Sequence, residues 1–417
     1  MDTKRKSWKL KQYFYRIIRE KTSKNLYFFT SSFPFGRGES FLENEILYLA
    51  KAFDNITIIP LYCYDIGGVI RNTPDNTQVL HPIIRSRLQH YFFGLFCLKT
   101  IHLYSKDFIS KSVYKKIEWV KMFLIDFCTI NNLMHSKTLR RVLQEIQKND
   151  IMYFYWGKGA SNLLPFLSTI AAKKVVRFHR GDLYDYLYDG YIPIQEEIVK
   201  KTDIAVFISI HGQNYLKNAY PHLQFNSVVS YLGTNDNGIS ESSNDNLFRL
   251  LSCSSVIPVK RLLLLFEALQ SVTDYEIEWT HIGAGTDFEK LNNVVQNINN
   301  NLKVRLLGQI SNQEVILFYQ KNRIDAFINV SSSEGLPVSL MEAISFNVPV
   351  IGTDVGGTSE IVTPETGILL PSNPTISDIA YALIRIRHLA LHPRLFWERN
   401  FNSAVNYPTF INQIQIS

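Results

Sequence analysis

Short runs of β-branched and aromatic residues alternate with helix-like segments along this chain, and the runs fall into two series. They lie at residues 26–30, 56–61, 151–155, 174–178 and 204–208, then at 248–253, 276–282, 304–307, 326–330 and 348–353. Strands separated by helical segments are typical of α/β domains, because parallel strands need crossover connections. At 417 residues the chain also exceeds the usual size of one hydrophobic core. The alternation therefore predicts two doubly wound α/β domains.

A polar stretch between the two series marks the expected domain boundary. Residues 234–246 are rich in turn formers, and Ile239 is their only large apolar side chain. We therefore expect a first domain over residues 1–235 and a second over 236–392. The remaining segment, 393–417, contains five aromatic side chains, which indicates a helical segment that packs back on the first domain.

The positive charge of the chain is concentrated near its start. Residues 1–24 hold nine Lys and Arg against two acidic residues, so their balance of 9 − 2 = +7 equals the net charge of the whole chain. Residues 82–125 interleave eight Lys and Arg with aromatic side chains. Such a segment suits an anionic membrane surface, or it forms helices that pack on the core while Lys and Arg point outward. No nucleic-acid-binding motif accompanies the charge, so a nucleic-acid partner is not expected.

Cysteine usage and hydropathy favour an intracellular protein. The four cysteines are scattered without a Cys-x-x-Cys pair, which argues against a disulfide framework or a zinc knuckle. The basic start is not followed by an apolar signal-peptide core, and no run is long enough to cross a bilayer. We expect a cytoplasmic protein that is peripheral on the inner face of the plasma membrane.

The strongest motif is SSSEGLPVSLMEAI at residues 331–344, directly after an apolar run. A strand, a loop of small residues and a helix are predicted in that order, with Pro337 at the first helical position. Gly335 lets the backbone approach a ligand closely, and the helix start attracts an anion. The residues predicted to bind this anion are Gly335, Leu336, Pro337, Val338 and Ser339.

Two carboxylates flank this helix start. Glu334 falls in the loop, and Glu342 falls about a turn and a half into the helix, so they can serve different parts of one ligand. Carboxylates beside an anion site are costly unless hydroxyls donate to them, as the hydroxyls of a sugar and a ribose would. Alternatively, Glu334 caps the loop and Glu342 faces water. The first interpretation indicates a nucleotide-sugar site.

The spacing of the two glutamates, together with VPVIGTDVGGTSEIV at 348–362, resembles the retaining family 4 glycosyltransferases of bacterial surface-polysaccharide synthesis. The resemblance includes Pro258-Val259-Lys260, Gly283-Ala284-Gly285 and Gly308, and it covers most of residues 247–370. It implies the GT-B fold, with two Rossmann-like domains facing a central cleft. It also implies transfer of a hexose or N-acetylhexosamine from a nucleotide-diphosphate sugar to a lipid-linked or polysaccharide acceptor, without a further cofactor or metal. A UDP-sugar is favoured over a GDP-sugar, although the sequence leaves the base open.

In that family the residue matching Glu334 contacts donor-sugar hydroxyls, the one matching Glu342 binds the ribose, and the one matching Lys260 neutralises the diphosphate. A cation there makes independent sense, because the leaving diphosphate gains charge in the transition state. The family's Arg five residues before the lysine is Ser255 here, and Arg261 is a possible substitute. Alternatively, Lys260 and Arg261 form an exposed helix start. Gly283 and Gly308 complete the predicted donor residues of the second domain.

A looser resemblance in the first domain covers FPFGRGESF at 33–41 and VRFHRGDLY at 176–184. His179 ends a strand-like run, where open α/β sheets present ligand-binding residues, so we predict a catalytic role for it beside Glu334. A structural histidine is the alternative. The remaining predictions place Gly36 and Gly38 at the donor, unless they form only a tight turn, and place Arg37, Glu39, Trp156 and Asp182 on the acceptor side.

No Asp-x-Asp sequence is present, so a metal-bridged diphosphate is not expected. His388 and His392 are four residues apart, but no Glu lies between them and Pro393 follows at once, which argues against a zinc-binding helix. Two other functions stay open: an epimerase or hydrolase acting on the nucleotide sugar, and a non-catalytic scaffold that keeps the GT-B fold.

Overall fold

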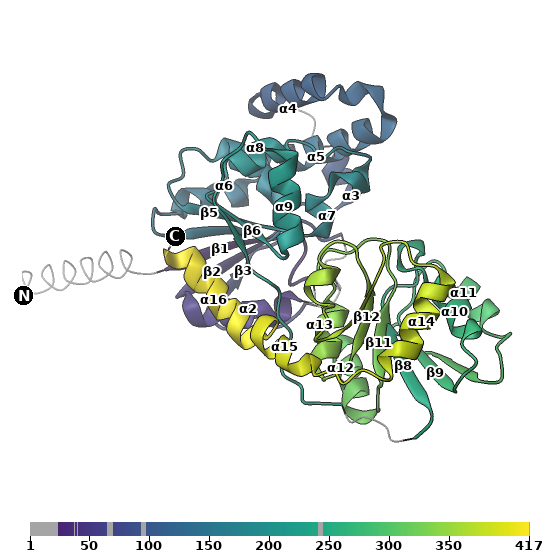
Figure 1. Ribbon diagram of the computed structural model, residues 1–417. Helices are drawn as coiled ribbons and strands as arrows, with labels where there is room; N and C mark the ends of the chain where they lie inside the picture. The colour runs from purple at the N-terminus through teal and green to yellow at the C-terminus, as the bar shows by residue number, and fades with distance from the viewer. Residues whose placement is uncertain are drawn as a thin grey trace, which may run out of the picture. The chain divides into compact units, whose positions relative to one another are not determined.

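The computed structural model describes residues 24–36, 38–39, 41–64, 70–92, 97–240 and 245–416. The basic segment 1–23 and the acceptor-side prediction for Arg37 lie outside these residues. The chain divides into two units, each built on one sheet (Figure 1). Unit 1 comprises residues 1–206, 216–228 and 411–417, and unit 2 comprises residues 207–215 and 229–410.

Unit 1 contains a seven-stranded sheet in the order β3-β2-β1-β4-β5-β6-β7. The pairings from β3 through β5 are parallel, and Leu26 of β1 lies between Ile56 of β2 and Ile151 of β4. The chain therefore starts at the centre of the sheet, builds one half and crosses over to build the other, as in Rossmann-like sheets. The strands are β1 Asn25–Thr30, β2 Asn55–Pro60, β3 Thr77–Val79, β4 Ile151–Phe154, β5 Lys173–Phe178, β6 Ile204–Phe207 and β7 Ser227–Val229.

Helices lie on both faces of the unit 1 sheet (Figure 1). Each strand of the sheet centre is accordingly apolar on both sides, as β4 shows with four consecutive buried residues. The helices are α2 Leu42–Ala52, α3 Arg87–Phe92, α4 Leu98–Ser110, α5 Ile117–His135, α6 Lys137–Glu145, α7 Arg180–Leu183 and α8 Gln195–Lys200, with 3-10 turns η1 Val113–Lys115, η2 Gly159–Phe166 and η3 Asp185–Tyr188. The next helix, α9 Ile210–Ala219, is divided between the units, since its residues up to 215 group with unit 2.

Unit 2 contains a six-stranded parallel sheet in the order β10-β9-β8-β11-β12-β13. The chain direction across the sheet reverses between β8 and β11, and open α/β sheets bind ligands beyond the carboxyl ends of the strands at such a switch point. The strands are β8 Phe248–Cys253, β9 Ile277–Ile282, β10 Leu302–Leu306, β11 Ala326–Asn329, β12 Val350–Thr353 and β13 Gly367–Leu370.

Both faces of the unit 2 sheet are buried. Leu250 of β8 packs in one apolar cluster with α10 and α14, whereas its neighbour Leu251 packs in another with α12 and α13. Successive residues of a strand point to opposite faces, so a sheet covered on both sides needs continuous apolar runs. The helices are α10 Leu262–Ser271, α11 Phe288–Val294, α12 Asn312–Lys321, α13 Val338–Ser345, α14 Ile376–Ile386, α15 Pro393–Asn400 and α16 Ser403–Ile416, with 3-10 turns η4 Pro258–Lys260 and η5 Thr358–Glu360.

The units divide at residues 228 and 229, slightly before the polar stretch that the sequence suggests as the linker. That stretch is held within unit 2, because the Trp397 indole donates to Thr234 Oγ1 at 2.7 Å and the Thr234 amide donates to the Phe401 carbonyl at 3.0 Å. The last segment is helical, and residues 411–417 group with unit 1. There Lys173 Nζ donates to the Ile414 carbonyl at 2.9 Å.

Candidate functional site

The loops at the carboxyl ends of β8, β9, β11 and β12 come together in unit 2, and glycines allow their close approach. A Cβ on Gly283, at φ +141°, would lie 1.9 Å from the Ser254 carbonyl oxygen after β8. A Cβ on Gly356, at φ +57°, would lie 2.0 Å from the Glu334 carbonyl oxygen after β11. No other residue type fits either position without moving a backbone. These contacts fix the loops that carry the predicted donor residues.

Lys260 and Glu334 form an ion pair at the switch point. Lys260 Nζ lies 2.6 Å from Glu334 Oε1, and the same oxygen accepts a hydrogen bond from Asn329 Nδ2 at 3.0 Å. The Asn329 side chain is fixed in turn, because its oxygen accepts the Ser331 amide at 2.9 Å. Lys260 follows β8 and Glu334 follows β11, so the switch point itself brings the two residues together across 74 positions of sequence.

The helix after Glu334 begins one residue later than the sequence indicates. Pro337 is the N-cap, with ψ 108°, and α13 starts at Val338. The reason is that the Pro337 carbonyl already accepts the amides of Leu340 and Met341, at 3.1 and 3.4 Å, from outside the helix. The Val338 and Ser339 amides have no acceptor within the helix and are available to an anion.

Glu342 is half-buried on α13 and faces α12, where Asn312 Nδ2 donates to its Oε1 at 2.9 Å. Burial raises the pKa of Glu342, and the Asn312 hydrogen bond opposes that rise. Burial and the nearby Glu342 charge also raise the pKa of Cys253 to about 12 and the pKa of Tyr319. The Tyr319 hydroxyl is buried without a hydrogen-bond partner among the residues that the structure describes. Glu342 is thus half-buried and hydrogen-bonded to α12, and it does not simply point into water.

Ser255 and Arg261, the two positions considered for a second phosphate contact, differ in their surroundings. Ser255 is exposed in the loop after β8. Arg261 adopts a left-handed conformation, and its guanidinium donates to the Ser372 carbonyl at 3.0 Å and to Asn373 Oδ1 at 3.4 Å. These groups follow β13 at the edge of the sheet, so Arg261 would have to leave them to replace the missing arginine. Gly308, at φ +69°, accepts the Gly283 amide at 2.8 Å and so joins the loops after β9 and β10.

In unit 1, His179 lies at the carboxyl end of β5 inside a cage of aromatic rings. Its ring centroid is 4.7 Å from that of Tyr155 and 4.6 Å from that of Trp156. The side chain is 6% exposed, and neither ring nitrogen has a hydrogen-bond partner in the described part of the chain. Burial, and then the positive charge of Arg177, hold the pKa of His179 well below 6.5. The imidazole is therefore neutral near pH 7, and both of its ring nitrogens are buried.

A buried ion pair beneath His179 is the part of the site that we did not predict from the sequence. Arg177 of β5 and Glu45 of α2 are both fully buried, with Nη1 and Oε2 2.9 Å apart. Tyr153 donates to Glu45 Oε1 at 2.9 Å. Arg177 and His179 are two residues apart on one strand and thus share a face. The signal in the sequence is a charged residue within the apolar run VVRF, which a buried strand tolerates only with a partner.

The acceptor-side carboxylates predicted for unit 1 are both engaged by the chain itself. Glu39 accepts the amides of Ser31, Ser32 and Phe33 at 3.0, 2.6 and 2.7 Å, and the Trp156 indole at 2.5 Å. Asp182 is fully buried, and it accepts the amides of His179 and Gly157. Burial raises the pKa of Asp182 to about 7. Both carboxylates position loops around His179, whereas Trp156 itself lines the aromatic cage.

The glycines of the first loop are less constrained. Gly36 has φ +69°, and a Cβ there would meet nothing within 4 Å. A Cβ on Gly38 would only touch Ser32 Oγ at 3.4 Å. A left-handed turn therefore explains Gly36 without a ligand.

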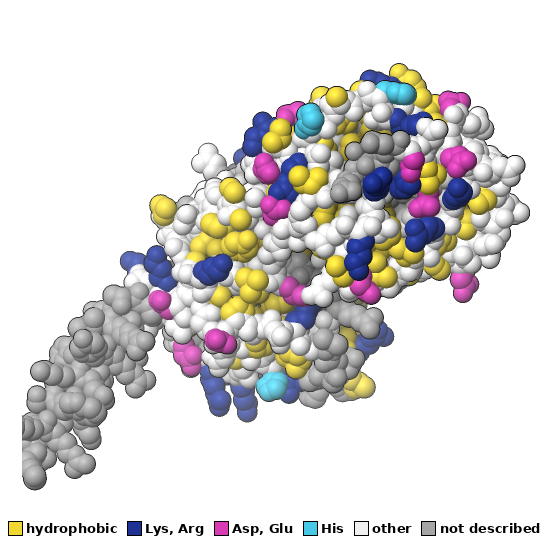
Figure 2. Space-filling model, turned by 90° about the horizontal axis from the view of Figure 1, so that it is seen from below, with side chains coloured by type: hydrophobic (Ala, Val, Ile, Leu, Met, Phe, Trp, Pro, Cys, Tyr) yellow, Lys and Arg dark blue, Asp and Glu magenta, His cyan; other side chains and the backbone are white. Residues whose placement is uncertain are grey.

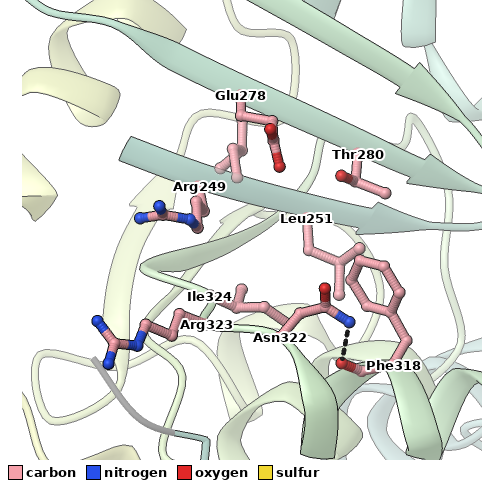
Figure 3. Close-up of a pocket in the computed structure, with 9 residues that line it drawn as sticks. Arg249, Leu251, Glu278, Thr280, Phe318, Asn322, Arg323 and Ile324 are labelled. Carbon is pink, nitrogen blue, oxygen red and sulfur yellow. Dashed lines mark hydrogen bonds between the residues drawn. The ribbon is translucent and has the colours of Figure 1, made fainter. Parts of the chain in front are cut away.

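A separate small pocket in unit 2 lies at the amino-terminal part of β8 and β9, beside the end of α12 (Figure 3). Arg249, Glu278 and Arg323 supply its charges, and Asn322 Nδ2 donates to the Phe318 carbonyl at 2.8 Å. Arg249 is neutralised by a two-nitrogen contact with Asp245, at 2.8 and 2.7 Å. None of the predicted donor residues lines this pocket, so it is not part of the candidate site.

Two Rossmann-like units with parallel sheets define the GT-B fold, and solved structures share it. The apo form of the lipopolysaccharide outer core galactosyltransferase WaaB superimposes with a TM-score of 0.65 over 94% of this chain and 98% of that chain, at 16% identity. HepE of Anabaena in complex with UDP gives a TM-score of 0.61 over 94% and 99% of the two chains, at 13% identity. The predicted GT-B fold is confirmed.

Sequence comparison identifies the second unit more closely. Residues 236–395 match the family model described as glycosyl transferases group 1. An uncharacterized glycosyltransferase of Methanocaldococcus jannaschii is 30% identical over 174 residues, which cover 41% of this chain and 47% of that protein. The O-antigen biosynthesis glycosyltransferase WbnH of Escherichia coli is 31% identical over 139 residues, or 33% and 37% of the two chains. The chain thus spans less than half the length of these curated relatives.

Proposed function

We propose that this protein is a retaining, metal-independent glycosyltransferase that moves a hexose or N-acetylhexosamine from a nucleotide-diphosphate sugar to a lipid-linked or polysaccharide acceptor in bacterial surface-polysaccharide synthesis. The observation that carries the proposal is the Lys260–Glu334 pair beside the start of α13, at the switch point of a group 1 glycosyltransferase domain. The names of relatives that act in O-antigen synthesis, and a GT-B neighbour crystallised with UDP, support the pathway and a UDP-linked donor.

The donor would lie across the carboxyl ends of the unit 2 strands. Its diphosphate would accept hydrogen bonds from the Val338 and Ser339 amides and from Lys260, whose charge offsets the negative charge that develops on the leaving group. Glu334 Oε2 would accept a sugar hydroxyl, since Oε1 is already held by Lys260 and Asn329. Glu342 would accept a ribose hydroxyl.

The reaction would break the bond between the anomeric carbon and the diphosphate oxygen and form a bond from that carbon to the acceptor hydroxyl oxygen. In such a retaining reaction the leaving group departs from, and the acceptor hydroxyl attacks, the same face of the sugar. The departing diphosphate oxygen can therefore take the proton of the acceptor hydroxyl. The carboxylates of Glu334 and Glu342 recognise hydroxyls in this proposal, and neither is a nucleophile. Neutral His179 would hydrogen-bond the transferred sugar, because neither ring nitrogen has a partner among the described residues and the imidazole carries no charge.

The two glutamates give the sharpest test. Glu334→Ala should lower turnover more than nucleotide affinity, whereas Glu342→Ala should weaken nucleotide affinity. Transfer rates and UDP affinity are measured for both variants, with the exposed Glu289→Ala of α11 as a control that changes neither. Wild-type transfer by both glutamate variants would refute the assignment. A first screen of UDP- and GDP-sugars, with and without acceptor, identifies the donor.

The same screen separates the alternative functions. Donor turnover that needs no acceptor indicates a hydrolase or epimerase. The absence of thermal stabilisation by any nucleoside diphosphate indicates a scaffold that keeps the fold. We place the transfer at the cytoplasmic side of the plasma membrane. Within the described ranges, no helix is both long and apolar enough to cross a bilayer.

A further inference from the structure

Exposed apolar side chains gather in one part of unit 1. Of the 23 large apolar side chains that are exposed in the described chain, eight lie between residues 88 and 125, on α3, α4, η1 and α5. The most exposed are Leu98 at 88%, Leu88 at 73%, Ile109 at 69%, Ile117 at 67% and Tyr114 at 60%. Scattered exposed apolar residues need no explanation, but such a concentration marks an interaction surface.

These side chains are not needed to hold the helices together. Tyr104 of α4 is fully buried against Phe123 and Phe127 of α5, with ring centroids 5.7 and 5.3 Å apart. Phe108 adds a third contact, 4.9 Å from Phe123. The two helices thus pack through an aromatic interior, which the half-exposed Tyr114 also touches, with its ring centroid 6.2 Å from that of Phe108. The packing interpretation of this segment therefore holds for the inner face of these helices, and the outer face is left to be explained.

Helix geometry places apolar and basic side chains next to each other on the outer face of α4. Leu98 and Ile109 lie about 20° apart around the helix axis, and Lys99 and Lys106 lie about 80–100° from Leu98. The buried Tyr104 lies about 120° from Leu98 on the other side. In Figure 1, α4 is the helix farthest from the sheet of unit 1. An apolar stripe beside a basic stripe is the pattern of helices that lie in a membrane interface.

The turn between α4 and α5 continues this pattern. Ser112 reverses the chain in a left-handed conformation, so the exposed Ile109, Tyr114 and Ile117 fall on one short hairpin. Residues 97–125 hold six lysines against Asp107 and Glu118, a balance of 6 − 2 = +4.

Half of these lysines are free of ion pairs within the described chain: Lys99, Lys106 and Lys115 have no acidic partner, whereas Lys111, Lys116 and Lys121 do. On the face in Figure 2, by contrast, Lys and Arg side chains are mixed with Asp and Glu.

We propose that the α4–α5 hairpin docks the protein on an anionic membrane surface, with Ile109, Tyr114 and Ile117 at the boundary between headgroups and acyl chains and with the lysines among the lipid phosphates. The positive balance selects an anionic bilayer over an uncharged apolar partner, because each lysine near such a surface adds attraction. Membrane docking would bring the protein to a lipid-linked acceptor, and only this consequence rests on the proposed function.

The test is flotation of the full-length protein with vesicles of phosphatidylcholine, with and without phosphatidylglycerol. The wild type should float with the anionic vesicles, less so as salt is raised, and not with the neutral ones. Replacing the hairpin residues, I109S/Y114S/I117S, should lower the partition coefficient by on the order of tenfold or more. The matched control is I298S/Y381S/L395S in unit 2, which removes three exposed apolar side chains elsewhere and should float as the wild type does.

Three outcomes would overturn the proposal. The first is unchanged flotation of the hairpin variant, which would assign the binding to the basic residues 1–24 instead. The second is equal binding of the wild type to neutral and anionic vesicles. The third is a wild-type dimer in solution that the hairpin substitutions dissociate. Hydrogen exchange on the wild type covers the case in which the variant misfolds, since vesicles should slow exchange at residues 109–121. Transfer to a water-soluble acceptor is measured in parallel, so that loss of docking and loss of catalysis are told apart.

Discussion

Replacing Lys260 with methionine removes one charge from the candidate donor site and keeps the length of the side chain. The 2.6 Å contact between Lys260 Nζ and Glu334 Oε1 is a charge-assisted hydrogen bond whose side chains are only 20% and 10% exposed. In the variant, Glu334 Oε1 keeps only the Asn329 amide. Leaving a largely buried carboxylate under-satisfied costs about 1–3 kcal/mol of the free energy of unfolding.

The donor should lose affinity as well. A hydrogen bond to a charged group contributes about 1.5–3 kcal/mol, so loss of the Lys260 contact to the diphosphate raises the Kd for UDP by about 10- to 150-fold. The double variant K260M/E334Q separates the two effects. Removing both charges should restore most of the stability, because no unpaired charge remains, but it should not restore UDP affinity.

Urea unfolding and calorimetric titration with UDP measure the two quantities on the same samples. Lys303→Met is the matched control, because Lys303 forms an exposed ion pair with Glu276 at 3.2 Å and such pairs contribute little. The reasoning is refuted if K260M binds UDP as tightly as the wild type does. A double variant that is no more stable than K260M would show that Glu334 does not depend on Lys260.

Three further predictions concern histidines and glycines. Because burial and Arg177 hold the pKa of His179 well below 6.5, the pH profiles of kcat for the wild type and His179→Gln should have the same shape from about pH 6 to about pH 8; an acid limb present only in the wild type would contradict this. Burial lowers the pKa of His281 to about 4, so the unfolded chain takes up this proton first as the pH falls. From about pH 6.5 to about pH 4.5 the wild type should therefore lose ~2 kcal/mol relative to His281→Asn in urea unfolding, and parallel curves would be the contrary result. Gly356→Ala should lower both Tm and UDP affinity, since its Cβ would overlap the Glu334 carbonyl, whereas Gly308→Ala, with open space, should cost only the left-handed conformation, about 1 kcal/mol; equal Tm losses would argue against a steric cause.

The strands that carry the site were predictable because their apolar runs are continuous. β8 has the predicted bounds, and the other predicted strands agree to within a few residues. β3, β7 and β13 were not predicted, since they are three or four residues long and none is fully buried. Pairing with a neighbouring strand defines such edge strands, and a local sequence pattern does not contain that information.

The contacts between the site residues were harder to predict than the identity of those residues. Glu334 was identified from its place before a predicted helix and Lys260 through the family resemblance, but their ion pair depends on β8 and β11 being neighbours in the sheet. The pair of Glu45 and Arg177 joins residues 132 positions apart, and Glu45 alone looks like an ordinary acidic residue near a helix start. Only the tertiary structure shows that the Asp182 carboxylate is occupied by two backbone amides.

The loop after β1 carries its own anion. Three consecutive amides and an indole N–H converge on Glu39, which is the geometry that proteins elsewhere offer to phosphate. The carboxylate acts as an internal surrogate for such a ligand, so a free phosphate would find the place filled and would be repelled by the charge that fills it. The first loop of unit 1 is therefore already occupied, which agrees with the proposal that the nucleotide binds to unit 2. Shortening Glu39 to alanine would convert this loop into an empty anion receptor.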